Sequence, residues 1–453
     1  MRDHCACRAG LRPVLPAAVF CLLLFFACIT PSFAAEIAER EVLPNGIILL
    51  HAEKKAVPII KVVVAIRAGS TAESPDKAGL ANLTADLLNE GTLKRSSQEI
   101  SEAIEFVGGA LHTSGGADSA TVTLSVLKKD VELGFDLLAD VILAPAFKQE
   151  EIARRKALLI SSIRQQKEEP GSIASKTFYK AVFGEHPYGW PVEGTEESLE
   201  TITREDIAGF YRMHYLPNNT IMAVVGDISR DELKALLNKY FRSWQKQEVL
   251  QKPLAAPEPV VGPHVVKISK KTKQAHIMLG HTGFRRDNPD YYAVSVMNYI
   301  LGGGGFASRL MDNIRDNRGL AYSVHSSFNA MKQAGIFQAG LQTKNESANT
   351  AIGEILNEMV RIQTEPVSDR ELSDAKAYLT GSFPLRLDSN SKMANFLVAI
   401  EMYDLGLDYI ERYRDLINKV TPEDVLRVAR KYLHTKDYVL VVVGDLEKAS
   451  LKY

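Results

Sequence analysis

Residues 79–92 read Gly-Leu-Ala-Asn-Leu-Thr-Ala-Asp-Leu-Leu-Asn-Glu-Gly-Thr, and this stretch contains the pattern that decides the fold. Its four leucines recur at helical spacing, which predicts a helix with one apolar, buried face. Asn82, Ala85 and Asp86 stand at positions i, i+3 and i+4 and therefore share the neighbouring face. Gly91 is suited to end the helix. We therefore expect a helix over residues 79–90 that presents an amide, a methyl group and a carboxylate side by side.

This frame is similar to the family of pitrilysin, insulin-degrading enzyme and mitochondrial processing peptidase. In the inverzincin arrangement the positions of Asn82, Ala85 and Asp86 read His, Glu and His: the two His bind Zn²⁺ and the Glu takes a proton from the metal-bound water. In the family, a Glu further along the chain completes the site. The matching segment here is residues 158–163, where both candidate positions, Ser162 among them, are Ser. The resemblance thus implies a zinc site that has lost every ligand and its base.

Other chemistry in the sequence does not replace the lost site. Asn82, Asp86 and Glu90 fall at i, i+4 and i+8 and offer an amide and two carboxylates to a hard cation, but a polar helix face is the interpretation we favour. His276 and His281 are five residues apart, and the other histidines are isolated. No Gly-x-Ser-x-Gly nucleophile motif is present. A hydrolase that relies on Asp86 alone is the least favoured hypothesis. We expect no metal or cofactor in this chain and no catalysis by the chain alone.

The segment 1–34 has the features of a secretory signal peptide. Three arginines, at positions 2, 8 and 12, precede an unbroken apolar run from Ala17 to Ile29, which is too short to span a bilayer comfortably. Small residues stand at the −3 and −1 positions of a cleavage site after Ala34. We predict cleavage there and a periplasmic or secreted protein. A retained membrane anchor and a lipoprotein at Cys28 are weaker alternatives.

The composition of the remaining chain is that of an ordinary soluble protein. The 453 residues are 46% hydrophobic and 24% charged, and this length favours two to four domains. The segment 1–34 contains all four cysteines, so the mature chain has no thiol for a disulfide, a metal site or a nucleophile. Removing it also takes away three arginines and one aspartate, which changes the formal net charge from −1 to −3. We therefore expect neither nucleic acid nor an anionic membrane surface as a partner.

Two segments of the first half recur in the second half at one offset. Residues 203–207 (Thr-Arg-Glu-Asp-Ile) match 421–425 (Thr-Pro-Glu-Asp-Val), and Val-Gly-Asp at 225–227 recurs at 443–445, so that both pairs have the same separation along the chain. A single offset for separated segments predicts duplication of an α+β unit of roughly 200 residues. The family resemblance implies two homologous αβ-roll domains that face each other as the halves of a clamshell. The expected division is a signal peptide at 1–34, an N-terminal domain at 35–250, a proline-rich linker at 251–264 and a C-terminal domain at 265–453.

Local signals predict the elements of the first half. Pro44-Asn45-Gly46 is a turn signal, and Ser96 with Glu99 forms a capping box. The expected strands are 47–50, 58–66 and 220–225, with a hairpin at 111–127, and the further helices are 96–107, 130–142, 150–166 and 204–214.

Arg315 and Tyr322 carry the strongest functional signal. In the family, an Arg and a Tyr seven residues apart at this place reach across to the zinc site, and Arg315 and Tyr322 have that spacing. Arg315 is expected to end a helix and Tyr322 to begin the strand after Gly319, so that a turn brings both to one place. A guanidinium and a phenol can donate hydrogen bonds to the oxygen of a carbonyl under attack.

A run of four glycines precedes this pair. Gly302, Gly303, Gly304 and Gly305 are followed by Phe306, and no Gly-Lys-Ser/Thr follows to make a phosphate loop. One interpretation is a flexible turn between helices. The other is a loop that lets a peptide backbone approach closely, and in this respect it resembles the glycine-rich loop of the non-catalytic subunit of the mitochondrial processing peptidase.

These observations lead to one hypothesis and one alternative. The hypothesis is a non-catalytic subunit of a heterodimeric metallopeptidase, whose partner carries the zinc and whose peptide substrate contacts Arg315 and Tyr322. The alternative is a peptide-binding or assembly protein with no role in hydrolysis.

Overall fold

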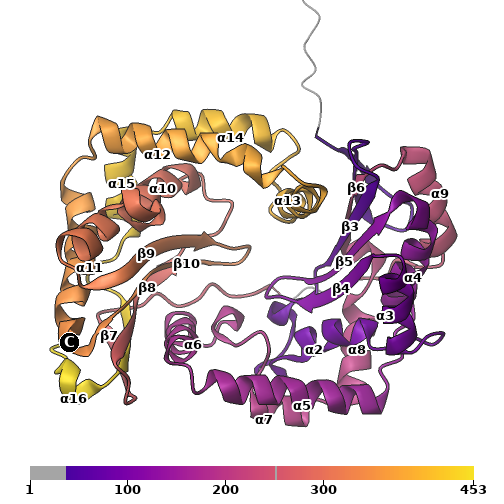
Figure 1. Cartoon of the computed structure of the whole chain (residues 1–453), viewed down its shortest axis with the longest axis horizontal. Coiled ribbons are helices and arrows are strands. Elements are labelled where there is room, and N and C mark those ends of the chain that lie inside the picture. The colour runs from indigo at the N-terminus through magenta and orange to yellow at the C-terminus, as the bar shows by residue number, and fades with distance from the viewer. Residues whose placement is uncertain (1–36, 250–252) are drawn as a thin grey trace, which may run out of the picture. The chain divides into compact units, whose positions relative to one another are not determined.

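The computed structural model describes residues 37–249 and 253–453. The predicted signal peptide and its cleavage site lie outside these residues, as do positions 251 and 252 of the predicted linker. Two separate sheets form, one from each half of the described chain (Figure 1). Among the described residues no helix is long and apolar enough to span a membrane.

The first sheet has six strands in the order β1-β2-β6-β3-β5-β4. Their bounds are β1 Glu39–Val42, β2 Ile48–Glu53, β3 Ile59–Ile66, β4 Ala110–Gly115, β5 Ala120–Leu127 and β6 Thr220–Gly226. The second sheet has five strands in the order β7-β11-β8-β10-β9. Their bounds are β7 His264–Ser269, β8 Gln274–Gly283, β9 Ala321–Ala330, β10 Gly335–Lys344 and β11 Val439–Gly444.

Helices surround both sheets. The first half contains α2 Leu80–Asp86, α3 Ser97–Phe106, α4 Val131–Leu143, α5 Gln149–Gln166, α6 Pro170–Phe183, α7 Glu196–Thr201, α8 Arg204–His214 and α9 Arg230–Phe241. The second half contains α10 Tyr291–Asn298, α11 Ala348–Thr364, α12 Asp369–Gly381, α13 Asn390–Met402, α14 Tyr409–Asn418, α15 Pro422–Tyr432 and α16 Leu446–Ala449. Two π-helical segments, Tyr299–Gly303 and Met311–Asn317, follow α10.

The sheet topology confirms the predicted duplication and the α+β class. Apart from β1, the two sheets have the same order, with a parallel pair (β2 with β6, β7 with β11) followed by antiparallel pairs. The recurring sequence segments occupy equivalent places, because Thr203 and Thr421 form capping boxes at the starts of α8 and α15. Gly226 ends β6 at φ +149°, and a Cβ there would lie 2.2 Å from the carbonyl oxygen of Ile59. This close approach explains why the repeated motif contains glycine.

One helix of each half packs on the sheet of the other half. α6 contacts β8 and β11 of the second sheet, whereas α13 contacts β3 and β6 of the first (Figure 1). The ring of Phe178 on α6 lies so close to β8 that its Cζ would be 2.9 Å from a Cβ at Gly280. From α13, Asn390 Nδ2 donates to the carbonyl of Ile59 at 3.0 Å. The expected division at residue 250 therefore separates the strands of the two sheets, but each of these two helices packs on the sheet of the other half. The domain boundaries stay a prediction.

The elements expected in the first half form close to their expected bounds. The helix over 79–90 is α2 followed by a 3₁₀ turn at Leu87–Asn89, and both sides of the capping box between Ser96 and Glu99 are present. α6 was not among the expected elements.

Candidate functional site

The start of α2 is held by the half-buried carboxylate of Glu73. Glu73 accepts hydrogen bonds from the backbone N–H of Gly79 at 2.9 Å and of Ala81 at 2.8 Å. Gly79 precedes the helix at φ +94°, a conformation that favours glycine. Burial raises the pKa of Glu73 to about 7, although the backbone N–H groups act in the opposite direction. The carboxylate thus fixes the end of the helix from which Asn82, Ala85 and Asp86 project.

Three of the four degenerate zinc positions, Asn82, Ala85 and Asp86, lie on α2. Asn82 Nδ2 donates to Asp86 Oδ2 at 3.4 Å, and Ala85 is fully buried. α2 packs tightly on the edge strand β4, because a Cβ at Gly115 would lie 2.4 Å from the Cα of Asn82. Asp86 is only 8% exposed.

A guanidinium from α5 occupies the space next to Asp86. Arg155 donates to Asp86 Oδ2 from Nη2 at 2.7 Å and from Nε at 3.1 Å. Burial raises the pKa of Asp86, and the contact with Arg155 opposes this rise. The positive charge that balances the carboxylate is therefore supplied by the chain itself.

The other two candidate metal positions have partners of their own. Ser162 lies two helical turns beyond Arg155 on the same side of α5, is exposed, and accepts a hydrogen bond from Gln166 Nε2 at 3.3 Å. Glu90 forms an ion pair with Arg154. Within the described ranges, no group of three or more His, Cys, Asp or Glu side chains is arranged to hold a metal ion. An amide, a methyl group, a paired carboxylate and a neutral hydroxyl do not fit zinc.

Arg315 and Tyr322 come together with Phe306. The guanidinium carbon of Arg315 lies 4.7 Å from the centroid of the Phe306 ring and 5.6 Å from that of Tyr322. Its Nη1 also donates to Asp316 at 2.9 Å. Tyr322 is 86% exposed and Phe306 is 70% exposed. The cluster of Phe306, Arg315 and Tyr322, here called the aromatic–arginine cluster, is therefore open to contact.

The local structure explains why the cluster forms. Arg315 lies near the end of the π-helical segment Met311–Asn317, and Tyr322 is the second residue of β9. Gly319 makes the turn between them at φ +60°, so the spacing of seven residues brings the two side chains to one place. Tyr322 is also on the edge strand of the second sheet, where no neighbouring strand covers it.

At three of the four positions of the glycine run, neighbouring atoms leave no room for a side chain. A Cβ at Gly302 would lie 2.7 Å from the backbone nitrogen of Ser326, one at Gly303 2.7 Å from Asn298 Nδ2, and one at Gly304 2.7 Å from the carbonyl oxygen of Tyr299. Only Gly305, at φ +58°, has open space beside it. The turn between helical segments is thus observed, and the contact of this run with a substrate stays a prediction.

Two features of the site were missed in the sequence. Arg154 and Arg155 fall in a helix that was expected, but neither was assigned a role. The available signal was Asp86 itself: a carboxylate next to a strongly apolar helix face requires a cationic or hydrogen-bonding partner. The stacking of Arg315 on Phe306 had no comparable signal, since it depends on the path of the glycine-rich turn.

Comparisons with known proteins show the family to which this fold belongs. The profile of a family described as Insulinase (Peptidase family M16) matches residues 49–196, and that of Peptidase M16 inactive domain matches residues 201–379. The chain is 30% identical to an uncharacterized zinc protease of Mycobacterium leprae, over 89% of this chain and 91% of that protein. It is 28% identical to an uncharacterized zinc protease of Streptomyces coelicolor, over 90% of each chain. The crystal structure of a peptidase M16 inactive domain from Pseudomonas fluorescens superposes with a TM-score of 0.84 at 30% identity, and 90% of this chain covers 98% of that one.

Proposed function

Because this chain belongs to the M16 family of peptidases, we propose that it is the non-catalytic subunit of an exported, heterodimeric zinc metallopeptidase. In this proposal the partner holds the zinc ion and the catalytic base. This chain supplies part of the peptide-binding surface together with the side chains of Arg315 and Tyr322. The predicted signal peptide is the basis for placing the complex in the periplasm or outside the cell.

The state of α2 supports the non-catalytic role. A zinc ion next to Asp86 would have to compete with the guanidinium of Arg155, which already donates two hydrogen bonds to that carboxylate. Ala85 has no group that can take a proton from water. Binding and activating a water molecule therefore falls to another chain.

The aromatic–arginine cluster is the observation that carries the proposal. When water or hydroxide attacks a peptide carbonyl, negative charge develops on the carbonyl oxygen. The guanidinium of Arg315 and the hydroxyl of Tyr322 are donors that can hold such an oxygen. Phe306 restricts the guanidinium, so less of its freedom is lost when a substrate binds. The hydroxyl of Tyr322 forms no hydrogen bond within the described part of the chain, so it is available to a substrate.

The proposal is tested by isolating the mature chain alone and together with a homologue that has an intact His-x-x-Glu-His motif. Zinc content is measured by elemental analysis and activity with an unstructured fluorogenic peptide. We expect no stoichiometric zinc and no cleavage for the chain alone, and one zinc per pair with cleavage for the complex. Tightly held zinc in the isolated chain would contradict the proposal. A stable pair whose activity does not depend on this chain would instead favour the assembly protein.

A further inference from the structure

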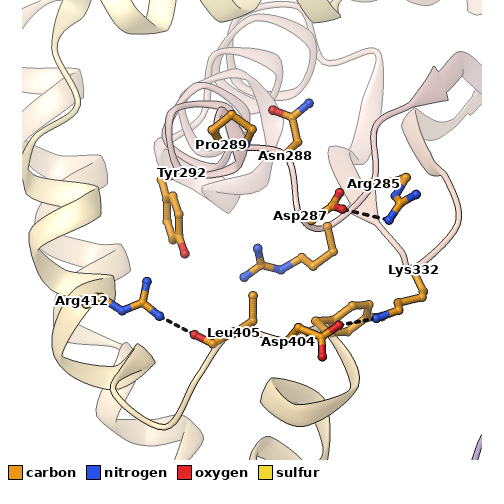
Figure 2. A pocket seen from close by; sticks show the side chains of 11 residues that line it. Arg285, Asp287, Asn288, Pro289, Tyr292, Lys332, Asp404, Leu405 and Arg412 are labelled. Atoms are coloured by element: carbon orange, nitrogen blue, oxygen red, sulfur yellow. Dashed lines mark hydrogen bonds and ion pairs between the residues drawn. The ribbon is translucent and has the colours of Figure 1, made fainter.

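A cavity of about 340 Å³ lies in the second half, outside the site described above. Its volume lies in the range of small-molecule sites. Figure 2 shows Tyr292 and Arg412 on one side of it and Lys332 on the other, with Leu405 and Asp404 between Arg412 and Lys332. The walls come from the loop between β8 and α10, the start of α10, the β9–β10 turn, the loop between α13 and α14, and α14 itself. We refer to it as the α10–α14 cavity.

Arg286 is the unusual member of the lining. It is 8% exposed, and its Nη2 donates to the hydroxyl of Tyr409 at 2.8 Å. Its guanidinium carbon lies 3.5 Å from the centroid of the Tyr291 ring, so the plane is held on an aromatic face. No described Asp or Glu pairs with it. A buried arginine without an acidic partner is uncommon, because transferring an unpaired charge from water into the protein is costly.

The remaining charges around the cavity are already paired. Arg285 pairs with Asp287 at 2.9 Å, Lys332 with Asp404 at 2.8 Å, and Arg412 with Asp408 at 2.6 Å. One positive charge, that of Arg286, is left without a counterpart.

A second buried arginine provides an internal comparison. Arg309 is also 8% exposed, and it forms a two-pronged ion pair with Glu371 at 2.6 and 3.1 Å. Arg286 is equally buried, but no described carboxylate lies against its guanidinium. Its side chain lines the cavity instead. The Tyr292 and Tyr403 side chains line that cavity, and their hydroxyls make no hydrogen bonds with the described residues. They are available as further donors.

From these observations we propose that the α10–α14 cavity binds a small organic molecule through a carboxylate group, which pairs with the guanidinium of Arg286. A carboxylate carries one negative charge and two acceptor oxygens, which match the single unpaired charge and the planar donors of arginine. Pro289, Tyr292 and Leu405 offer apolar surface to the carbon skeleton. Two kinds of ligand carry such a carboxylate: a free organic acid and a peptide with a free C-terminus.

The experiment uses matched acids and amides on the full mature chain. Isothermal titration compares benzoate with benzamide, and acetyl-alanyl-phenylalanine with its C-terminal amide. We expect at least about tenfold tighter binding of an acid than of its amide. Tight binding of benzoate identifies a free acid as a sufficient ligand, and binding of the peptide acid alone identifies a peptide C-terminus. Equal binding of acid and amide in both pairs would overturn the proposal. Displacement of the acids by equimolar inorganic phosphate would also do so, since it indicates a general counter-ion site.

Three variants separate the site from the general charge of its surroundings. Arg286→Lys keeps the charge but loses the planar donor pair, and we expect at least about tenfold weaker binding of the acid. Leu405→Trp places a larger side chain in the cavity from a half-buried loop position and should abolish binding. It tests the site independently of Arg286→Lys, which matters if that variant does not fold. Arg414→Gln removes an exposed charge of α14 that does not line the cavity, and it should change the affinity less than about threefold. Undiminished binding to Leu405→Trp would place the ligand elsewhere and overturn the assignment.

Discussion

Asp86 on α2 and Arg155 on α5 form a partly buried ion pair in which two guanidinium nitrogens, at 2.7 and 3.1 Å, donate to one carboxylate oxygen. In the zinc peptidases that this helix resembles, the position of Asp86 holds a metal ligand. Here the carboxylate is balanced by a side chain instead of a metal ion. The helix keeps its place in the fold, and its former chemistry is replaced by an electrostatic contact between two helices.

Removing the guanidinium should destabilise the protein more than removing both partners. Arg155→Leu leaves Asp86 buried without a counter-charge, and we expect a loss of about 2–4 kcal/mol in the free energy of unfolding. In the double variant Asp86→Asn/Arg155→Leu no charge is left unpaired, so at least half of that loss should be recovered. Urea denaturation of the single and double variants measures both values, and equal losses would show that the pair has no electrostatic role.

Glu73 should make stability depend on pH. Its pKa is raised to about 7 in the folded chain, whereas an unfolded chain has a Glu pKa near 4.3. The folded state therefore binds the proton more tightly, and stability falls as pH rises from about 4 through 7, by roughly 3–4 kcal/mol at most.

Glu73→Gln removes that titration, so the fall in stability between pH 5 and pH 8 should become shallower. Denaturation at three or more pH values tests this prediction, with Glu99→Gln as the control. The pKa of Glu99 is lowered by its capping contacts with Ser96, so its titration affects stability only at more acidic pH. An identical slope in Glu73→Gln and the unmodified chain would contradict the prediction.

Helix α6 should hold the second sheet through Phe178. This side chain is fully buried against β8, and Phe178→Ala should reduce the free energy of unfolding by about 3–5 kcal/mol. Lys180→Ala, on the exposed side of the same helix, should change it by less than about 0.5 kcal/mol. If the two variants unfold at the same denaturant concentration, the packing of α6 on the second sheet does not contribute as described.

Phe306 should position Arg315 without contributing to folding. Phe306→Ala removes an exposed cation–π contact of about 0.5–1 kcal/mol, so kcat/KM of the assembled pair should fall roughly two- to fivefold. The free energy of unfolding should stay within about 0.5 kcal/mol. Leu93→Ala removes a similarly exposed apolar side chain elsewhere and is the matched control. An equal effect of both variants on kcat/KM would exclude a positioning role for Phe306.

Patterns local in the sequence predicted much of the fold. The spacing of leucines, the capping boxes and the Asn-Gly turn act within a few residues, and the elements that they predict are present. The shared offset of the two recurring segments predicted two sheets of one topology, because equivalent strands end in the same Val-Gly-Asp motif.

What could not be predicted depends on contacts distant in the sequence. α6 ends at Phe183 and packs on a sheet whose first strand begins only at His264, so no local pattern indicates its partner. The pairing of Asp86 with Arg155 joins residues 69 positions apart. The environment of Arg286 could not be predicted either, because only the tertiary structure shows that its guanidinium is buried without an acidic partner among the described residues.

The central claim is that this chain completes the active site of a partner, and the kcat of the assembled pair with Tyr322→Phe tests it most directly. The substitution removes one hydroxyl from an 86% exposed side chain, so folding and pairing should be unchanged. We predict that kcat falls by roughly 10²–10³, as expected for the loss of one donor to the developing oxyanion. An unchanged kcat in a correctly assembled pair would contradict the account.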